Sequence, residues 1–192
     1  MKVPLPIVRH ARRLALVALL AAVPLAGCDD PFDNQSPLPT EPSPASLSDF
    51  RTADLSEATA FQVNGARTVA PSQSGVWDFV FWIADDGDPQ FRARDMIASG
   101  ESDAGLAAVN VGLAQLEEAP QEGYATDEPV PADSGAVYAV RGAPDPNIGC
   151  RYYAKIEVVA VDTAAGTVTF EHLVNPNCGS RNLLPGDAGL ED

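Results

Sequence analysis

The chain is short of the side chains that most often carry catalysis or bind metals. It has two histidines, three cysteines and two methionines among 192 residues. Nucleophilic catalysis needs a base beside the nucleophile, yet there is no GxSxG motif, and His172 is the only histidine after residue 27. We therefore predict a protein that is not an enzyme and that has no cofactor. The 27 acidic residues leave a carboxylate-dependent hydrolase as an alternative.

Long apolar runs are also lacking, because the only one covers residues 14–23. This run is shorter than the roughly 20 residues that a transmembrane helix needs. Positive charges precede it, at Lys2, Arg9, Arg12 and Arg13. A positive segment followed by a short apolar core is typical of an export signal peptide, which we place at residues 1–27.

The end of this signal carries a motif of its own. Leu25-Ala26-Gly27-Cys28 resembles the lipobox of bacterial lipoproteins, in which an aliphatic residue and two small residues precede the lipidated cysteine. The resemblance implies that Cys28 becomes the first mature residue and carries acyl chains such as palmitate. The protein would then be anchored to a membrane of the cell envelope, with its domain in the periplasm or outside the cell. The alternative is an ordinary signal peptide followed by an unmodified cysteine. Asp29 resembles an enterobacterial inner-membrane retention signal, but other phyla differ, so both membranes stay open.

Basic residues become scarce once the signal is removed. Four of the twelve lie within it, which leaves eight basic and 27 acidic side chains, a formal charge of −19. Such a surface repels phosphate backbones and anionic headgroups. We therefore predict no nucleic-acid partner, and contact with the bilayer only through the acylated Cys28. The ligand or protein partner and the oligomeric state stay open.

Composition divides the mature chain into three parts. Residues 28–49 contain five prolines and few apolar side chains, so we predict a disordered, Pro-rich tether. Residues 50–184 are predicted to form a single β-rich domain, and residues 185–192 a flexible acidic tail. The fold class expected is mainly β, an antiparallel sheet or sandwich of hairpins with at most one short helix.

Strand patterns occupy most of this domain. Residues 76–84 and 90–98 are predicted to pair as a hairpin across an acidic turn, residues 105–119 to form a strand followed by a short helical turn, and residues 135–141 to form another strand. In the acidic turn, Asp85, Asp86 and Asp88 surround Gly87, as in some calcium loops. An ordinary hairpin turn uses the same residues and the twelve-residue ligand pattern is missing, so we predict no metal site. Asp78 lies within an apolar strand and is predicted to be a buried carboxylate with a raised pKa.

A second hairpin is predicted from residues 150–162 and 167–174, which flank a turn ending at Gly166. Pairing residues whose numbers sum to 328 separates two faces. Ile156, Val158, Phe170 and His172 then point into the core, and Lys155, Glu157, Thr169 and Glu171 point away from it.

The same register places Cys150 opposite Cys178, close enough for a disulfide bond. These are the only cysteines after Cys28, and an exported protein favours a disulfide between them. The alternative, a zinc site completed by His172, is disfavoured because that histidine lies several residue pairs away.

Several strand motifs together resemble a known family. Residues 74–81, 135–141, 152–156 and 166–170 follow in the order seen in HmuY-like lipoproteins, which are exported, largely β proteins, some of which bind haem. The resemblance implies a fold and a location. Members that bind haem use two histidines, whereas His172 stands alone here, with Met96 or a tyrosine as the alternative second ligand. His172 and Met96 are thus the candidate ligand-binding residues, and a buried core histidine is the other interpretation of His172.

We therefore expect a membrane-anchored lipoprotein whose non-catalytic β domain binds a ligand or partner or serves a structural role in the envelope. An HmuY-like protein that binds haem or another small ligand is the first alternative, and a carboxylate-dependent hydrolase is the second.

Overall fold

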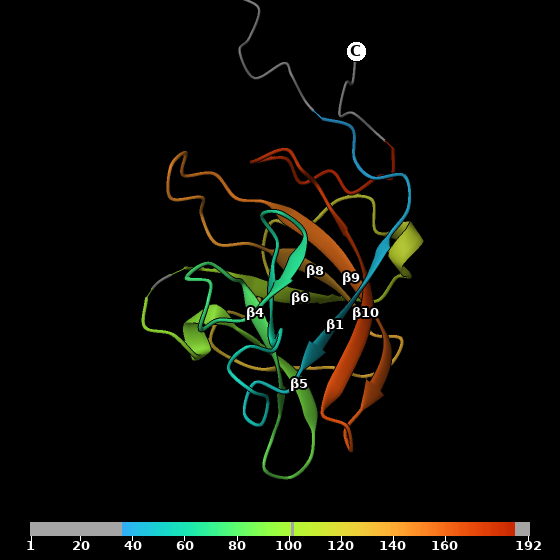
Figure 1. The fold of residues 1–192 in the computed structure, drawn as a ribbon. Helices are drawn as coiled ribbons and strands as arrows, with labels where there is room; N and C mark the ends of the chain where they lie inside the picture. The colour runs from blue at the N-terminus through green and yellow to red at the C-terminus, as the bar shows by residue number, and fades with distance from the viewer. Residues whose placement is uncertain (1–35, 101, 187–192) are drawn as a thin grey trace, which may run out of the picture. The chain divides into compact units, whose positions relative to one another are not determined.

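A computed structural model describes residues 36–100 and 102–186 of the chain. Its strands form two antiparallel five-stranded sheets, joined by turns and by two short 3-10 helices (Figure 1). The predicted fold class, mainly β with hairpins, is confirmed. The signal peptide, Cys28 and the beginning of the predicted tether lie outside the described residues.

The first sheet has the order β1-β10-β9-β8-β6. Its strands, in chain order, are β1 (Ser43–Ser48), β6 (Gly105–Val109), β8 (Val137–Arg141), β9 (Tyr153–Asp162) and β10 (Thr167–Val174). The second sheet has the order β3-β2-β4-β5-β7. Its strands are β2 (Ala60–Gln62), β3 (Arg67–Val69), β4 (Phe79–Ile83), β5 (Pro89–Ala93) and β7 (Val130–Pro131).

The core lies between the two sheets and is rich in aromatic rings. Alternate residues of β4 and β5 point toward the first sheet, because side chains in a strand alternate between its two faces. Phe170 of β10 meets Phe61 of β2 edge to face, with ring centroids 5.4 Å apart. The phenylalanines that fill this layer are all completely buried: Phe61, Phe79, Phe81, Phe91 and Phe170. Contacts of this kind join the two sheets into one sandwich.

Strand β1 corrects the predicted tether, which was expected to be disordered through residue 49. Residues 43–48 pair with β10 along their whole length, from Ser43 opposite His172 to Ser48 opposite Thr167. Leu47 is buried in the core, and Leu38 is also buried. Pro44 is tolerated because β1 is an edge strand, where the missing N–H interrupts no ladder on the outer side. The folded domain therefore begins before residue 50.

The first predicted hairpin is present as β4 and β5, but its strands are shorter than expected. They pair from Phe79 opposite Ala93 to Ile83 opposite Pro89, across the acidic turn. The chain then leaves the sheet in the 3-10 helix η1 (Arg94–Met96) instead of continuing as a strand to residue 98. Asp95 explains this departure, because its carboxylate accepts hydrogen bonds from the backbone N–H groups of Ser102 and Asp103 and draws the chain into a loop.

The predictions for residues 105–119 and 135–141 are confirmed. Residues 105–119 begin as strand β6 and continue into the 3-10 helix η2 (Leu113–Gln115). Strand β8 pairs with both β6 and β9, which places it inside the first sheet. Its four residues from Val137 to Val140 are buried, as expected for a strand covered on both faces.

The second predicted hairpin, β9–β10, has the expected register over the half that is farther from its turn. Phe170 pairs with Val158 and His172 with Ile156, so these numbers sum to 328. A β-bulge between Thr169 and Phe170 shifts the pairing by one residue near the turn, which the predicted uniform register missed. Gly166 has a φ of +68°, as the turn requires.

Cys150 and Cys178 form a disulfide bond with their Cα atoms 5.6 Å apart, as predicted. They lie beyond the ends of β9 and β10, because β9 begins at Tyr153 rather than at residue 150. The disulfide therefore joins the two segments that leave the open end of the hairpin.

Lys155 points away from the core, as predicted, but it is not exposed to solvent. A second apolar layer covers that face of the first sheet, formed by η2 and the segments on either side of residues 119 and 183. Lys155 is 1% exposed, and its Nζ donates a hydrogen bond to the carbonyl of Leu116 at 2.9 Å. Burial lowers the pKa of this ammonium group, although Glu117 opposes the shift.

Candidate functional site

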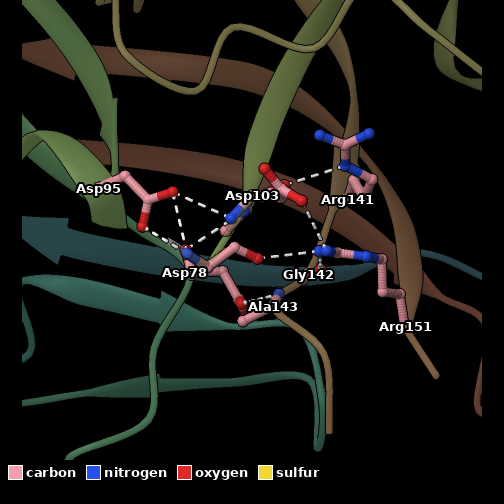
Figure 2. Close-up of polar contacts among 9 residues, drawn as sticks. Asp78, Asp95, Asp103, Arg141, Gly142, Ala143 and Arg151 are labelled. Carbon is pink, nitrogen blue, oxygen red and sulfur yellow. Dashed lines mark hydrogen bonds and ion pairs between the residues drawn. The ribbon is translucent and has the colours of Figure 1, made fainter. Parts of the chain in front are cut away.

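A polar network connects segments that precede and follow several strands. It brings together the residues before β4, after β5, before β6, after β8 and before β9 (Figure 2). Its ionisable members are Asp78, Asp95, Asp103, Arg94, Arg141 and Arg151. These residues come from five separate segments of the chain, so the network connects those segments.

Asp78 is the buried centre of this network, with an exposed fraction of 3%. Its Oδ2 accepts a hydrogen bond from the N–H of Val63 and its Oδ1 accepts one from the N–H of Ala143, both at 2.7 Å. Burial raises the pKa of this carboxyl group, while the two amide donors and the charges of Arg94 and Arg151 act in the opposite direction. This confirms the predicted buried carboxylate.

The arginines of the network bind backbone carbonyls as well as carboxylates. Nη1 of Arg151 donates to the carbonyls of Ser102 and Gly142, and its Nη2 forms an ion pair with Asp103 at 3.0 Å. Nε of Arg141 donates to the carbonyl of Asp103 at 2.9 Å (Figure 2). Asp103 has a φ of +50°, a conformation that these contacts hold in place.

These contacts determine what the network can do. A raised pKa is typical of a general acid, but a catalytic group must also reach a substrate. Both oxygens of Asp78 are occupied by backbone donors, and the carboxylate of Asp95 is occupied in the same way. The network therefore acts as a structural clamp between loops.

His172 lies in the core, where His172 and two phenylalanines form an aromatic cluster. Its ring centroid is 4.9 Å from that of Phe61 and 6.1 Å from that of Phe170. Burial lowers the pKa of the imidazole, and the backbone of Ser43 and Ala66 opposes this shift. Nδ1 has no hydrogen-bond partner among the described residues. The core interpretation of His172 is thus the one that the structure supports.

Met96, the other candidate ligand, lies in the 3-10 helix η1 and is partly buried. This helix directly follows β5 of the second sheet, whereas His172 belongs to β10 of the first sheet.

The acidic turn forms one ion pair with a distant segment and one hydrogen bond within the turn. Asp85 pairs with Arg51 at 2.6 Å, and the N–H of Asp88 donates to Oδ1 of Asp86 at 3.2 Å. Within the described part of the chain, no group of three or more histidine, cysteine, aspartate or glutamate side chains is arranged to hold a metal ion.

Among the depressions formed by the described residues, two lie beside strands. The first, of about 340 Å³, lies beside β7, and its lining includes three prolines and the exposed carboxylates Asp88 and Asp133. The second, of about 450 Å³, lies beside the start of β8 and contains Glu157. Asp88 and Asp133 are the only pair of carboxylates that one of these two depressions brings together, and sequence reasoning did not pair them because 45 residues separate them.

Comparison with known proteins adds no further information. No protein-family model matches the chain, and neither a curated protein nor a solved structure matches it significantly. The similarity to HmuY-like lipoproteins and to the lipobox stays a prediction from the sequence. A search of the described residues finds no helix with the length and apolar character needed to span a bilayer.

Proposed function

We propose that this protein is an exported lipoprotein, anchored to a bacterial membrane through Cys28, whose β-sandwich domain works by binding and not by catalysis. The observation that carries the proposal is the disulfide between Cys150 and Cys178. Disulfides form and persist mainly in oxidising compartments outside the cytoplasm. A disulfide in the domain and a lipobox-like motif at the N-terminus independently favour the same location.

The non-catalytic part of the proposal is supported by how the ionisable side chains are used. Asp78 and Asp95 accept hydrogen bonds from backbone amides, Lys155 donates to a carbonyl, and His172 lies among phenylalanines. Each of these groups contacts other parts of the domain, which favours a role within the fold over contact with a substrate. A hydrolase that uses Asp88 and Asp133 is less well supported, because both are exposed and prolines form most of the remaining surface.

The anchoring is tested by replacing Cys28 with serine in the full chain. We expect the natural protein to incorporate radiolabelled palmitate and to sediment with membranes, and Cys28→Ser to do neither. Because Cys150 and Cys178 are bonded to each other, a variant in which both are replaced should still be labelled and serves as the matched control. Continued labelling of Cys28→Ser would refute the proposal.

A further inference from the structure

The first residue of the described chain is held on the domain by two hydrogen bonds. The backbone N–H of Ser36 donates to Oδ1 of Asn177 at 2.7 Å, and Nδ2 of Asn177 donates back to the carbonyl of Ser36 at 2.8 Å. We call this pair of hydrogen bonds the clasp. It joins the chain to the segment after β10 at residue 36, before β1 begins at Ser43.

Buried residues support the clasp on both sides. Asn175 is completely buried, and its Oδ1 accepts a hydrogen bond from the N–H of Asn177 at 2.8 Å. On the N-terminal side, Leu38 is 2% exposed. The carbonyl of Pro39 accepts a hydrogen bond from the N–H of Gly186 at 3.2 Å. The segment between the clasp and β1 therefore belongs to the folded domain.

The clasp and the hairpin turns lie at opposite ends of the β9–β10 hairpin. Asn177 lies beyond its open end, next to the disulfide. At its closed end, the N–H of Asp49 donates to the carbonyl of Gly166 at 2.7 Å. Oδ1 of Asp49 accepts from the N–H of Ile83 at 3.0 Å, which joins the β9–β10 turn to the start of the acidic turn. Figure 1 shows the blue start of the described chain beside the red segment after β10, at the end opposite to both turns.

The clasp leaves only a short length of chain between the domain and the proposed anchor. Eight residue steps lead from Cys28 to Ser36. They span at most about 29 Å when fully extended, at about 3.6 Å per residue. A tether that ran to residue 49, as the sequence predicted, would reach roughly 75 Å. The clasp therefore shortens the reach of the anchor by more than half.

The length of the domain decides which end can lie near the bilayer. Strand β10 has eight residues and is about 27 Å long at about 3.4 Å per residue, and Asn177 lies three residues beyond it. If the turns faced the bilayer, the clasp would stand roughly 30 Å above the surface, and the chain from Cys28 would have to be fully extended. Full extension costs conformational entropy, whereas the opposite orientation does not require it.

We propose that the clasp end of the domain faces the membrane and that the two turns point away from it. This inference rests on the proposed function, because it needs an acyl anchor at Cys28. The segments around the disulfide then lie near the lipid headgroups. A partner or ligand outside the bilayer meets the turn end first, where Asp85 and Asp86 are exposed.

The test is energy transfer from a donor dye on the lipidated full chain to a headgroup-labelled acceptor lipid in phosphatidylcholine vesicles. Leu184→Cys places the donor in the segment after β10, near the clasp, and Ala165→Cys places it in the β9–β10 turn; both side chains are exposed. We expect transfer at position 184 to exceed transfer at position 165 by at least about twofold, because a strand of about 27 Å separates the two ends. Equal transfer, or stronger transfer at position 165, would overturn the orientation.

The donor can be attached at one site only. Cys150 and Cys178 are bonded to each other, and Cys28 is acylated under the proposed function. The introduced thiol is then the only free one, since the chain has three cysteines of its own.

A longer tether tests the reason for the orientation. Inserting about twenty Gly and Ser residues between Gln35 and Ser36 adds roughly 25 Å of average reach and should lower the transfer at position 184 by at least about twofold. The same insertion after Gly186 is the matched control, because it leaves the tether unchanged and should not alter the transfer. No response to the longer tether would also overturn the inference.

Flotation of the vesicles separates the orientation from the anchor. A natural chain that floats with the vesicles but shows equal transfer at the two positions would refute the orientation alone. A natural chain that does not float would overturn both the anchor and the orientation.

Discussion

At the scale of single residues, Asp78 connects segments that are distant in the chain. Its partners Val63 and Ala143 lie 15 and 65 residues away. An aspartate inside an apolar strand pattern was enough to predict a buried carboxylate. Its partners were not predictable, because two loops of irregular conformation supply them and no sequence period relates those loops to β4.

The raised pKa of Asp78 predicts a pH dependence of stability. A carboxyl group whose pKa is higher in the folded state binds its proton more tightly when folded, so its contribution falls as pH rises from the ordinary value of 3.8 through the raised value. We expect Asp78→Asn to remove this part of the pH dependence of the free energy of unfolding. Urea denaturation at several pH values between about 3.5 and 7 measures it.

Asp86→Asn is the matched control for this experiment, because Asp86 is exposed in the acidic turn. It removes the same charge without removing a buried group. If Asp78→Asn and the natural protein lost stability in parallel as pH rises, the assignment of this dependence to Asp78 would be wrong.

Lys155 shows what single-residue patterning leaves out. Alternation correctly placed it on the face opposite to Ile156, but it does not predict what covers that face. The structure instead covers that face with η2 and a C-terminal segment around Leu183. Strand periodicity contains no information about a layer formed by loops.

At the scale of elements, β1 is the segment whose prediction failed, because proline content was given more weight than alternation. Ala45 and Leu47 point toward the core on alternate positions, a pattern that a short edge strand shares with a tether. The very short strands β2, β3 and β7 were not predicted for a different reason. Two or three residues are too few to establish a period.

A leucine pair tests the role of β1. Leu47 is 1% exposed, so Leu47→Ala leaves a cavity in the core and should lower the free energy of unfolding by about 2 to 5 kcal/mol. Leu55 is 82% exposed, and Leu55→Ala should change it by less than about 0.5 kcal/mol. Urea denaturation compares the two variants. Equal stabilities would mean that β1 is not part of the folded domain.

The disulfide is the second feature that can be tested at this scale. It closes a loop with a sequence separation of 28, for which the chain-entropy model gives a stabilisation of about 3 to 4 kcal/mol. We expect Cys150→Ala/Cys178→Ala to lose about that amount in urea denaturation. A reductant should destabilise the natural protein and leave the double variant unchanged. A reductant effect that persisted in the variant would show that the stabilisation has another source.

At the scale of the whole molecule, the general architecture followed from the sequence more closely than the surface did. Hairpins, the cysteine pair and the class of fold could be predicted from local patterns, since the two strands of a hairpin are close in sequence. The contacts of arginines with Trp77 and Trp82 could not, because Arg51 is distant in the chain from Arg92 and Arg94. Net charge describes an average over the chain, so it does not locate these contacts.

The central claim, an exported and lipid-anchored domain, is tested most directly by mass spectrometry of the N-terminal peptide of the protein isolated from membranes. We predict a peptide that begins at Cys28 and carries a covalently bound diacylglyceryl group, with no peptide from residues 1–27. A chain that begins at Met1, or a Cys28 that carries a free thiol, would contradict the account.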